Sequence, residues 1–353
     1  MKWIFQIAVI LMIPFTLSSK QLECLCRCND PCYIPDGEPD LFRRCDQIYS
    51  GHVELLYWTA SESALDYALK MRADAWGPTP SFAQGRFENA TYGMDLGFRL
   101  GFLYFRAPHY WEMRWQYTRM TNRGTDHSSK PSGAQQFLTG TWPQIMNQPL
   151  AAVKSSIHLN YNVFDWLVDR VFFPNPHLRL RVLGGSCVVW MDQDWKVRYS
   201  DSTPNTTTIR NRWHFVGAGL KSGSIFDWYW TGDLYMTAAG SFGVLVGSYS
   251  NHAKQTTSFQ PTINDNPNVP LRNLSYHDTR AAVTLQMLLG PSYQKNFTKN
   301  RVEMFAGFEV TTWYNLHEVY RSTAGAPQEA KETWINSSIL ALYGLTTRVT
   351  VDF

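Results

Sequence analysis

Charged side chains recur at every second position inside stretches of otherwise apolar residues. Glu112 and Arg114 are separated by a single residue, and so are Arg179 and Arg181. Residues two apart in an extended strand point to the same face, so each pair would present its charges side by side. Rings of such charges set ion selectivity in narrow pores, whereas opposite charges on neighbouring strands can instead pair and brace an interior.

These positions form a set of candidate pore-lining residues. Six are arginine and four are acidic, which predicts a mild anion preference. The candidates are Asp95, Arg99, Glu112, Arg114, Arg179, Arg181, Asp278, Arg280, Arg348 and Asp352.

Five of the six cysteines crowd near the N-terminus, and Cys187 stands alone far downstream. In an exported chain such a cluster predicts disulfides, either within the segment or to neighbouring molecules. The spacing C-x-C-x-C-x3-C could instead hold a soft metal such as zinc, but no histidine follows at finger spacing, so we predict no metal site. The odd number leaves at least one thiol for cross-linking to another envelope protein. The disulfide candidates are Cys24, Cys26, Cys28, Cys32 and Cys45.

Residues 337–353 show the kind of element that would position the charges. Phe353, Val351 and Val349 fall on one face of an extended strand, and Asp352 and Arg348 fall on the other. This could be the closing strand of a soluble sandwich or jelly roll. A transmembrane β-barrel explains it better, because lipid covers one face and the lumen wets the other. The terminal Phe353 is then the candidate signal for the barrel-assembly machinery.

Similar two-faced segments recur along the chain, and we expect each apolar face to meet lipid and each polar face to line the interior. In one of them Ile157 and Leu159 oppose His158 and Asn160. The connections alternate between long and short, as in outer-membrane barrels, and place both termini on the short-turn, periplasmic side. The segments are 52–70, 92–105, 110–120, 154–165, 177–191, 211–221, 229–248, 276–290, 301–314 and 338–353.

The fold class is therefore all-β: an antiparallel up-and-down transmembrane barrel of about 10 to 14 strands, with 10 to 12 as the best count. Segments 52–70 and 229–248 could each split, and residues 136–142 could add a strand. Residues 1–19 read as a signal peptide, 20–50 as a Cys-rich periplasmic extension and 51–353 as the barrel.

Bulk composition agrees with this assignment. The chain has 353 residues, of which 15% are aromatic and 17% charged, with a mean hydropathy of −0.29. These values argue against a helical membrane protein and are typical of alternating membrane strands with interfacial Trp and Tyr. A formal charge of +3 without a basic run gives no support for nucleic-acid binding.

Six short motifs stand out along the chain: 53–58 (VELLYW), 64–68 (ALDYA), 93–101 (GMDLGFRLG), 159–165 (LNYNVFD), 178–185 (LRLRVLGG) and 213–220 (WHFVGAGL). Together with the C-terminal strand they resemble the Legionella-type pore-forming outer membrane protein family, which includes MOMP-like porins of environmental chlamydiae. The likeness spans residues 52–353. It implies an outer-membrane barrel acting as a porin, often abundant and disulfide-linked in the envelope, and it supplies no catalytic residue.

We therefore expect an outer-membrane porin for small hydrophilic solutes or ions. The alternative is a disulfide-cross-linked structural envelope protein, or a surface adhesin with little channel activity. No hydrolase, metalloprotease or nucleotide-binding motif occurs, so we expect neither catalysis nor a cofactor. The expected partners are outer-membrane lipid, the barrel-assembly machinery and other cysteine-rich envelope proteins or a second copy of the chain. Ten strands would leave a narrow lumen.

Overall fold

The computed structural model describes residues 47–71, 85–106, 110–133, 136–142, 149–175, 177–203, 205–258, 270–297, 300–322 and 333–353. The predicted signal peptide and the clustered cysteines lie outside these residues. No helix within the described ranges is long and apolar enough to cross a membrane.

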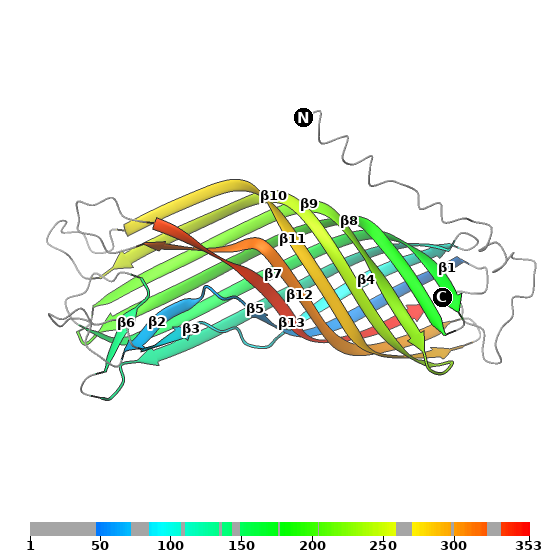
Figure 1. Ribbon diagram of the computed structural model, residues 1–353, viewed down its shortest axis with the longest axis horizontal. Helices are drawn as coiled ribbons and strands as arrows, with labels where there is room; N and C mark the ends of the chain where they lie inside the picture. The colour runs from blue at the N-terminus through cyan, green and yellow to red at the C-terminus, as the bar shows by residue number, and fades with distance from the viewer. Residues whose placement is uncertain are drawn as a thin grey trace, which may run out of the picture.

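Ten antiparallel strands close into a barrel (Figure 1). Each strand pairs with its neighbour along the chain, and β1 closes the ring by pairing with both β13 and β4. This confirms the predicted up-and-down barrel, at the lower limit of the expected strand number. The strands are β1 Gln47–Ser61, β4 Asp95–Arg106, β5 Trp111–Ser129, β7 Leu150–Asn175, β8 Leu178–Asp201, β9 Thr206–Tyr229, β10 Leu234–Thr257, β11 Pro270–Asn296, β12 Arg301–Ser322 and β13 Thr333–Asp352.

A separate three-stranded sheet lies at one end of the barrel (Figure 1). It consists of β2 Asp66–Met71, β3 Gly85–Asn89 and β6 Phe137–Gly140, with β2 in the middle. Segment 52–70 therefore does split, as β1 ends at Ser61 and β2 joins this small sheet. Residues 136–142 do contain a strand, but β6 belongs to the small sheet and adds nothing to the barrel.

The two ends of the barrel differ in their connections. Residues 107–110, 176–177, 230–233 and 297–300 make short links at the end where the C-terminus lies, which we call the turn end (Figure 1). The backbone of Phe353 exchanges two 2.9 Å hydrogen bonds with Tyr49 there. The opposite, loop end carries the small sheet and the connections 62–94, 130–149, 202–205, 258–269 and 323–332.

One predicted long connection, residues 192–210, is wrong. β8 and β9 continue to pair as far as Ser200 and Thr206, so only residues 202–205 link them. The alternation persists through this stretch, but its polarity is inverted: Trp195 and Tyr199 face inward and are fully buried. In this stretch the apolar residues face the interior and the polar residues face outward, which is the reverse of the pattern that marks a membrane-spanning strand.

An apolar band surrounds the barrel on its outer face. On β5, Trp111 is 46% exposed and Met113 41%, and on β13 Val349 is 44% exposed. Leu285 occupies an outward position of β11 and is half-buried. Outward apolar and inward polar side chains thus alternate as predicted for these strands, and lipid covers the apolar set.

Polarity inverts toward the loop end of β7 to β10. Ile157 and Leu159 were expected to meet lipid, but both are buried inside the barrel, and Lys154 and His158 point outward. The cause is strand length: β10 has 24 residues, whereas about 9–11 are enough to cross a bilayer. The surplus stands beyond the lipid, where the outer wall meets water.

Two changes on the outer face of β10 should separate these zones. Phe242→Arg places a charge inside the apolar band and should lower the free energy of unfolding by about 2–4 kcal/mol. His252→Arg, on the same face beyond the band, should change it little. Chemical denaturation of protein refolded into lipid vesicles measures both. Equal effects of the two changes would show that the apolar band is misplaced.

Candidate functional site

The barrel interior near the turn end is lined by charged side chains, because the inward positions of the membrane-spanning stretches are polar. On β12, Arg301, Glu303 and Glu309 alternate with the outward residues Val302 and Met304. In a ten-stranded barrel these side chains meet across the lumen. The described inward charges here are therefore buried rather than bathed in solvent.

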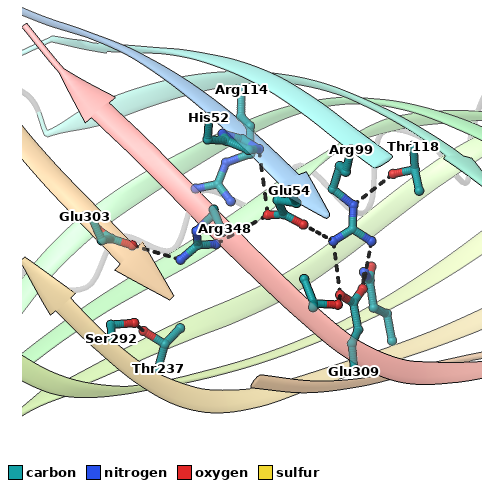
Figure 2. A network of polar contacts seen from close by, with 12 residues as sticks. His52, Glu54, Arg99, Arg114, Thr118, Thr237, Ser292, Glu303, Glu309 and Arg348 are labelled. Atoms are coloured by element: carbon teal, nitrogen blue, oxygen red, sulfur yellow. Dashed lines mark hydrogen bonds and ion pairs between the residues drawn. The ribbon is translucent and has the colours of Figure 1, made fainter. Parts of the chain in front are cut away.

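Arg99 on β4 is the hub of the central network (Figure 2). Its guanidinium donates to Glu54 of β1 at 2.5 Å and makes two bonds to Glu309 of β12, at 2.8 and 3.1 Å. Its Nε donates to the hydroxyl of Thr118 at 2.9 Å. Because β12 is three strands away from β4 around the ring, Arg99 ties non-adjacent parts of the wall together.

The network continues from Glu309 to the far wall. Gln286 on β11 donates to Glu309 at 2.5 Å and accepts from Lys221 of β9 at 2.9 Å. Lys221 in turn donates to Asp165 of β7 at 2.9 Å. The six side chains from Glu54 to Asp165 thus form one continuous series of contacts, since each hydrogen-bonded pair shares a member with the next.

Arg348 of β13 lies closer to the turn end (Figure 2). It donates to Glu303 at 2.9 Å and approaches Glu54 at 3.7 Å. Arg301 pairs with Asp352 at 2.5 Å and donates to Gln294 at 2.9 Å. Both arginines therefore tie β12 to its neighbours.

A further cluster occupies the opposite wall near the turn end. Arg179 and Arg181 of β8 both donate to one oxygen of Asp227 on β9, each at 2.9 Å. Arg114 of β5 donates to Glu112 at 2.9 Å and to Asp169 of β7 at 3.0 Å. Opposite charges inside the barrel are thus brought within contact distance of one another.

Eight of the ten predicted pore-lining residues are buried in the interior or nearly so; Arg280 among them is bound to Glu318 and stacked 3.6 Å above the Tyr249 ring. The other two lie apart from the central network. Asp95 is half-buried at the loop end of β4 and accepts from the backbone N–H of Arg123 at 2.7 Å. Asp278 is partly exposed and accepts from Arg280 at 2.9 Å.

Sequence reasoning missed most of the acidic partners. The signal for those on β12 was available, because they alternate with the apolar positions that marked the strand. Asp165 and Asp169 were hidden because the inward face of β7 changes from apolar to acidic along the strand. Lys221 and Asp227 lie in a stretch whose glycines blur the alternation. The missed residues are Glu54, Asp165, Asp169, Lys221, Asp227, Arg301, Glu303 and Glu309.

The loop end of the lumen is filled by apolar side chains from the small sheet and its flanking connections, which we call the plug. Tyr67 and Trp142 are buried there against the long strands. The Tyr199 hydroxyl donates to the carbonyl oxygen of Tyr67 at 2.8 Å, and the rings of Trp142 and Trp195 lie 4.8 Å apart. The plug comprises Leu65, Tyr67, Tyr92, Leu138 and Trp142.

A second set of polar contacts, centred on Gln193, also holds the plug against β8. Gln193 donates to the Glu62 carboxylate at 2.6 Å and to the Tyr92 hydroxyl at 2.6 Å. The Tyr92 hydroxyl donates to Glu62 at 3.2 Å. Burial raises the pKa of Tyr92 well above its ordinary value, and the nearby Glu62 adds to the rise. Tyr92 therefore stays protonated and keeps its donor role.

The described residues contain no group of three or more side chains suited to hold a metal ion. The interior therefore contains a row of paired charged side chains on the turn-end side of the apolar plug, and we call this row the charged file. Paired buried charges brace the wall, and the same groups would coordinate an ion that entered the lumen.

Breaking the central hub should be costly. Arg99→Met leaves Glu309 without its cation and Glu54 with only the more distant Arg348, 3.7 Å away, and should lower the free energy of unfolding by about 3–5 kcal/mol. Arg212→Met removes an ion pair on the outer wall, where the Arg212 side chain is 56% exposed, and should cost no more than about 1 kcal/mol. Urea unfolding in vesicles compares the two. A small loss for Arg99→Met would mean that the interior is hydrated.

Comparison with known protein families gives a match over most of the chain. The family model of the Legionella pneumophila major outer membrane protein precursor matches residues 46–353. No curated protein matches.

Several solved outer-membrane structures are also similar. The outer membrane protease OmpT from Escherichia coli is 11% identical, with a TM-score of 0.41 over 88% of this chain and 97% of that chain. A FadL homologue from Pseudomonas aeruginosa is 7% identical, with a TM-score of 0.24 over 87% and 90% of the two chains. The CymD monoaromatic hydrocarbon channel is 8% identical, with a TM-score of 0.28 over 88% and 89%. At TM-scores this low, none of the three bears on what this chain does.

Proposed function

Because this chain belongs to the family of the Legionella pneumophila major outer membrane protein and is an outer-membrane β-barrel, we propose that it is a narrow channel for ions and small hydrophilic solutes. The observation that carries the proposal is the file of charged side chains inside the membrane-spanning part of the barrel. An interior that served packing alone would be stable with apolar side chains, since buried ion pairs are often no better than hydrophobic residues of the same volume.

The width of the barrel limits what could pass. Eight strands leave just enough room for side chains, and wide aqueous channels occur at sixteen or more. In a ten-stranded barrel, a solute could pass residues such as Arg99 and Arg348 only by replacing some of the hydrogen bonds and ion pairs that they make with other side chains. We therefore propose passage of ions and very small solutes, with no catalytic step.

The charge balance argues against strong selectivity. Among the buried side chains, acidic residues are at least as numerous as lysine and arginine. The sequence predicted a mild anion preference because arginines outnumbered acidic residues among the candidates. That comparison left out the acidic partners Glu54, Glu303 and Glu309. We propose weak selectivity between cations and anions.

The plug would act as the closing element. Tyr67, Trp142 and Trp195 fill the loop end of the lumen, so an ion could reach the charged file only when the plug moves aside. Outer-membrane barrels keep their longer loops on the cell surface, which would place the plug at the outer opening.

Conductance across a planar bilayer tests this proposal. Trp142→Ala removes a buried aromatic ring from the plug, and such truncations lower stability by about 3–5 kcal/mol. Each 1.4 kcal/mol of this loss that falls on the closed state alone raises the ratio of open to closed channels about tenfold. We expect brief, small openings of the native protein and openings about tenfold or more frequent in the variant. Phe87→Ala is the matched control, because Phe87 lies on the same small sheet but is 59% exposed.

A structural role in the envelope is the second candidate. The observation in its favour is that the inward charges are paired and buried, as in an interior that is braced. If neither the native protein nor Trp142→Ala conducts, this candidate replaces the channel.

The structural role makes its own prediction about the cysteines, which lie outside the described residues. Replacing Cys24, Cys26, Cys28, Cys32 and Cys45 by Ser should abolish any high-mass, reductant-sensitive species on non-reducing gels of cell envelopes. Replacing the buried Cys187 instead should leave such species in place. Envelopes without cross-linked species would remove the support for this role.

A further inference from the structure

Six exposed basic side chains gather on the outer wall of the barrel, toward the loop end. They occupy outward positions of β7, β8, β9 and β10, beyond the apolar band, and we call them the basic belt: Lys154, Lys196, Arg198, Arg210, Arg212 and Lys254. The acidic outward residues of these four strands are Asp192 and Asp194. The basic surplus of this one patch exceeds the formal charge of +3 of the whole chain.

Strand register places like charges directly opposite one another. Lys196 lies opposite Arg210, and Arg210 lies opposite Lys254 on the next strand. Lys154 lies opposite Arg198. Like charges at such positions are destabilising, so a wall built this way gains stability from a bound anion.

Within the protein, one carboxylate relieves part of this repulsion. Asp194 accepts hydrogen bonds from Arg210 and, at 3.1 Å, from Arg212. Asp192 accepts instead from the Asn160 side chain at 2.8 Å. The cations of Lys154, Lys196 and Lys254 thus remain directed outward, along one side of the barrel.

The belt stands at a defined height above the lipid. The ring of Trp190, on the same outward face of β8, stacks on Tyr117 at 5.9 Å, and Val188 follows on the lipid side. Such aromatic rings mark the edge of the hydrocarbon layer. Lys196 lies beyond Trp190 by about 20 Å along the strand, or about 15 Å in height for a strand tilted by about 40°.

This height exceeds the reach of an ordinary phospholipid headgroup. The polar layer on each side of a bilayer is only about 5–8 Å thick. A headgroup built from sugars extends further, and phosphates on those sugars would lie level with the belt. Arginine forks bind phosphate oxygens in pairs, and lysine adds a point charge.

We propose that the basic belt binds the phosphorylated sugar headgroup of an anionic glycolipid in the outer leaflet, while the apolar band below it contacts the acyl chains. This assignment uses the outer-membrane location and does not depend on channel activity. It makes the β7–β10 side of the barrel a lipid-binding face.

Native mass spectrometry of the refolded protein in detergent tests the proposal with three probes: a lipopolysaccharide with a phosphorylated core oligosaccharide, the same lipid after removal of its core phosphates, and phosphatidylglycerol. The native protein should bind the lipid with the phosphorylated core most tightly. Each cation near a charged lipid surface contributes about 1 kcal/mol, so Lys196→Gln/Lys254→Gln should weaken that binding roughly tenfold to thirtyfold. Arg106→Gln/Lys295→Gln removes two exposed cations at the turn end and should leave it unchanged.

Other outcomes would overturn the assignment. Equal binding of the two lipopolysaccharide forms would show that the core phosphates are not recognised. Equal binding of phosphatidylglycerol, lost in the same variant, would identify a phospholipid site. An equal loss of lipid binding in the turn-end control would show that the binding depends only on the net charge of the protein. Lys154→Gln/Arg198→Gln must weaken lipid binding as much as Lys196→Gln/Lys254→Gln does. Lipid binding by the native protein that does not fall as salt is added would also refute the proposal.

Discussion

The pairing of buried charges inside a narrow ring is the interaction on which this structure depends. A ten-stranded barrel has too little interior for a wide column of water, so inward polar residues must satisfy one another. Arg99 does this for two carboxylates, Glu54 on the adjacent strand β1 and Glu309 on β12, three strands away around the ring. Because each partner belongs to a different strand, these contacts fix the shape of the cross-section as well as the charge balance.

The second constraint is the mismatch between strand length and membrane thickness. β7 to β10 are long enough to cross the bilayer and to continue well beyond it. Register shifts are confined to the strand ends, so the same alternation runs through the membrane and beyond it, and along these strands the inward residues change from charged to apolar toward the loop end. The plug fills the interior at this end, and the basic belt stands on the outer wall about 15 Å above the edge of the lipid.

The sequence was sufficient for the fold and for part of the interior. The alternation around Phe353, Val349 and Arg348 predicted a barrel strand because, from Gly344 onward, the inward residues are polar or glycine and most outward residues are apolar. The assumption that the apolar face meets lipid failed for Ile157 and Leu159. Alternation along a strand shows which residues share a face, but it does not show which of the two faces meets lipid. Contacts such as Arg99 to Glu309 depend on closure of the ring, and local pattern carries no record of them.

Closure of the ring by β1 joins the two extremes of the chain. Val53 lies opposite Val349 on β13 and opposite Leu100 on β4. Until the last strand has been made, β1 would present an open edge of N–H and C=O groups, which hydrocarbon does not tolerate. Insertion is therefore tied to completion of the polypeptide: an intermediate lacking β13 has no stable place inside the bilayer, and the barrel enters it as a nearly finished cylinder.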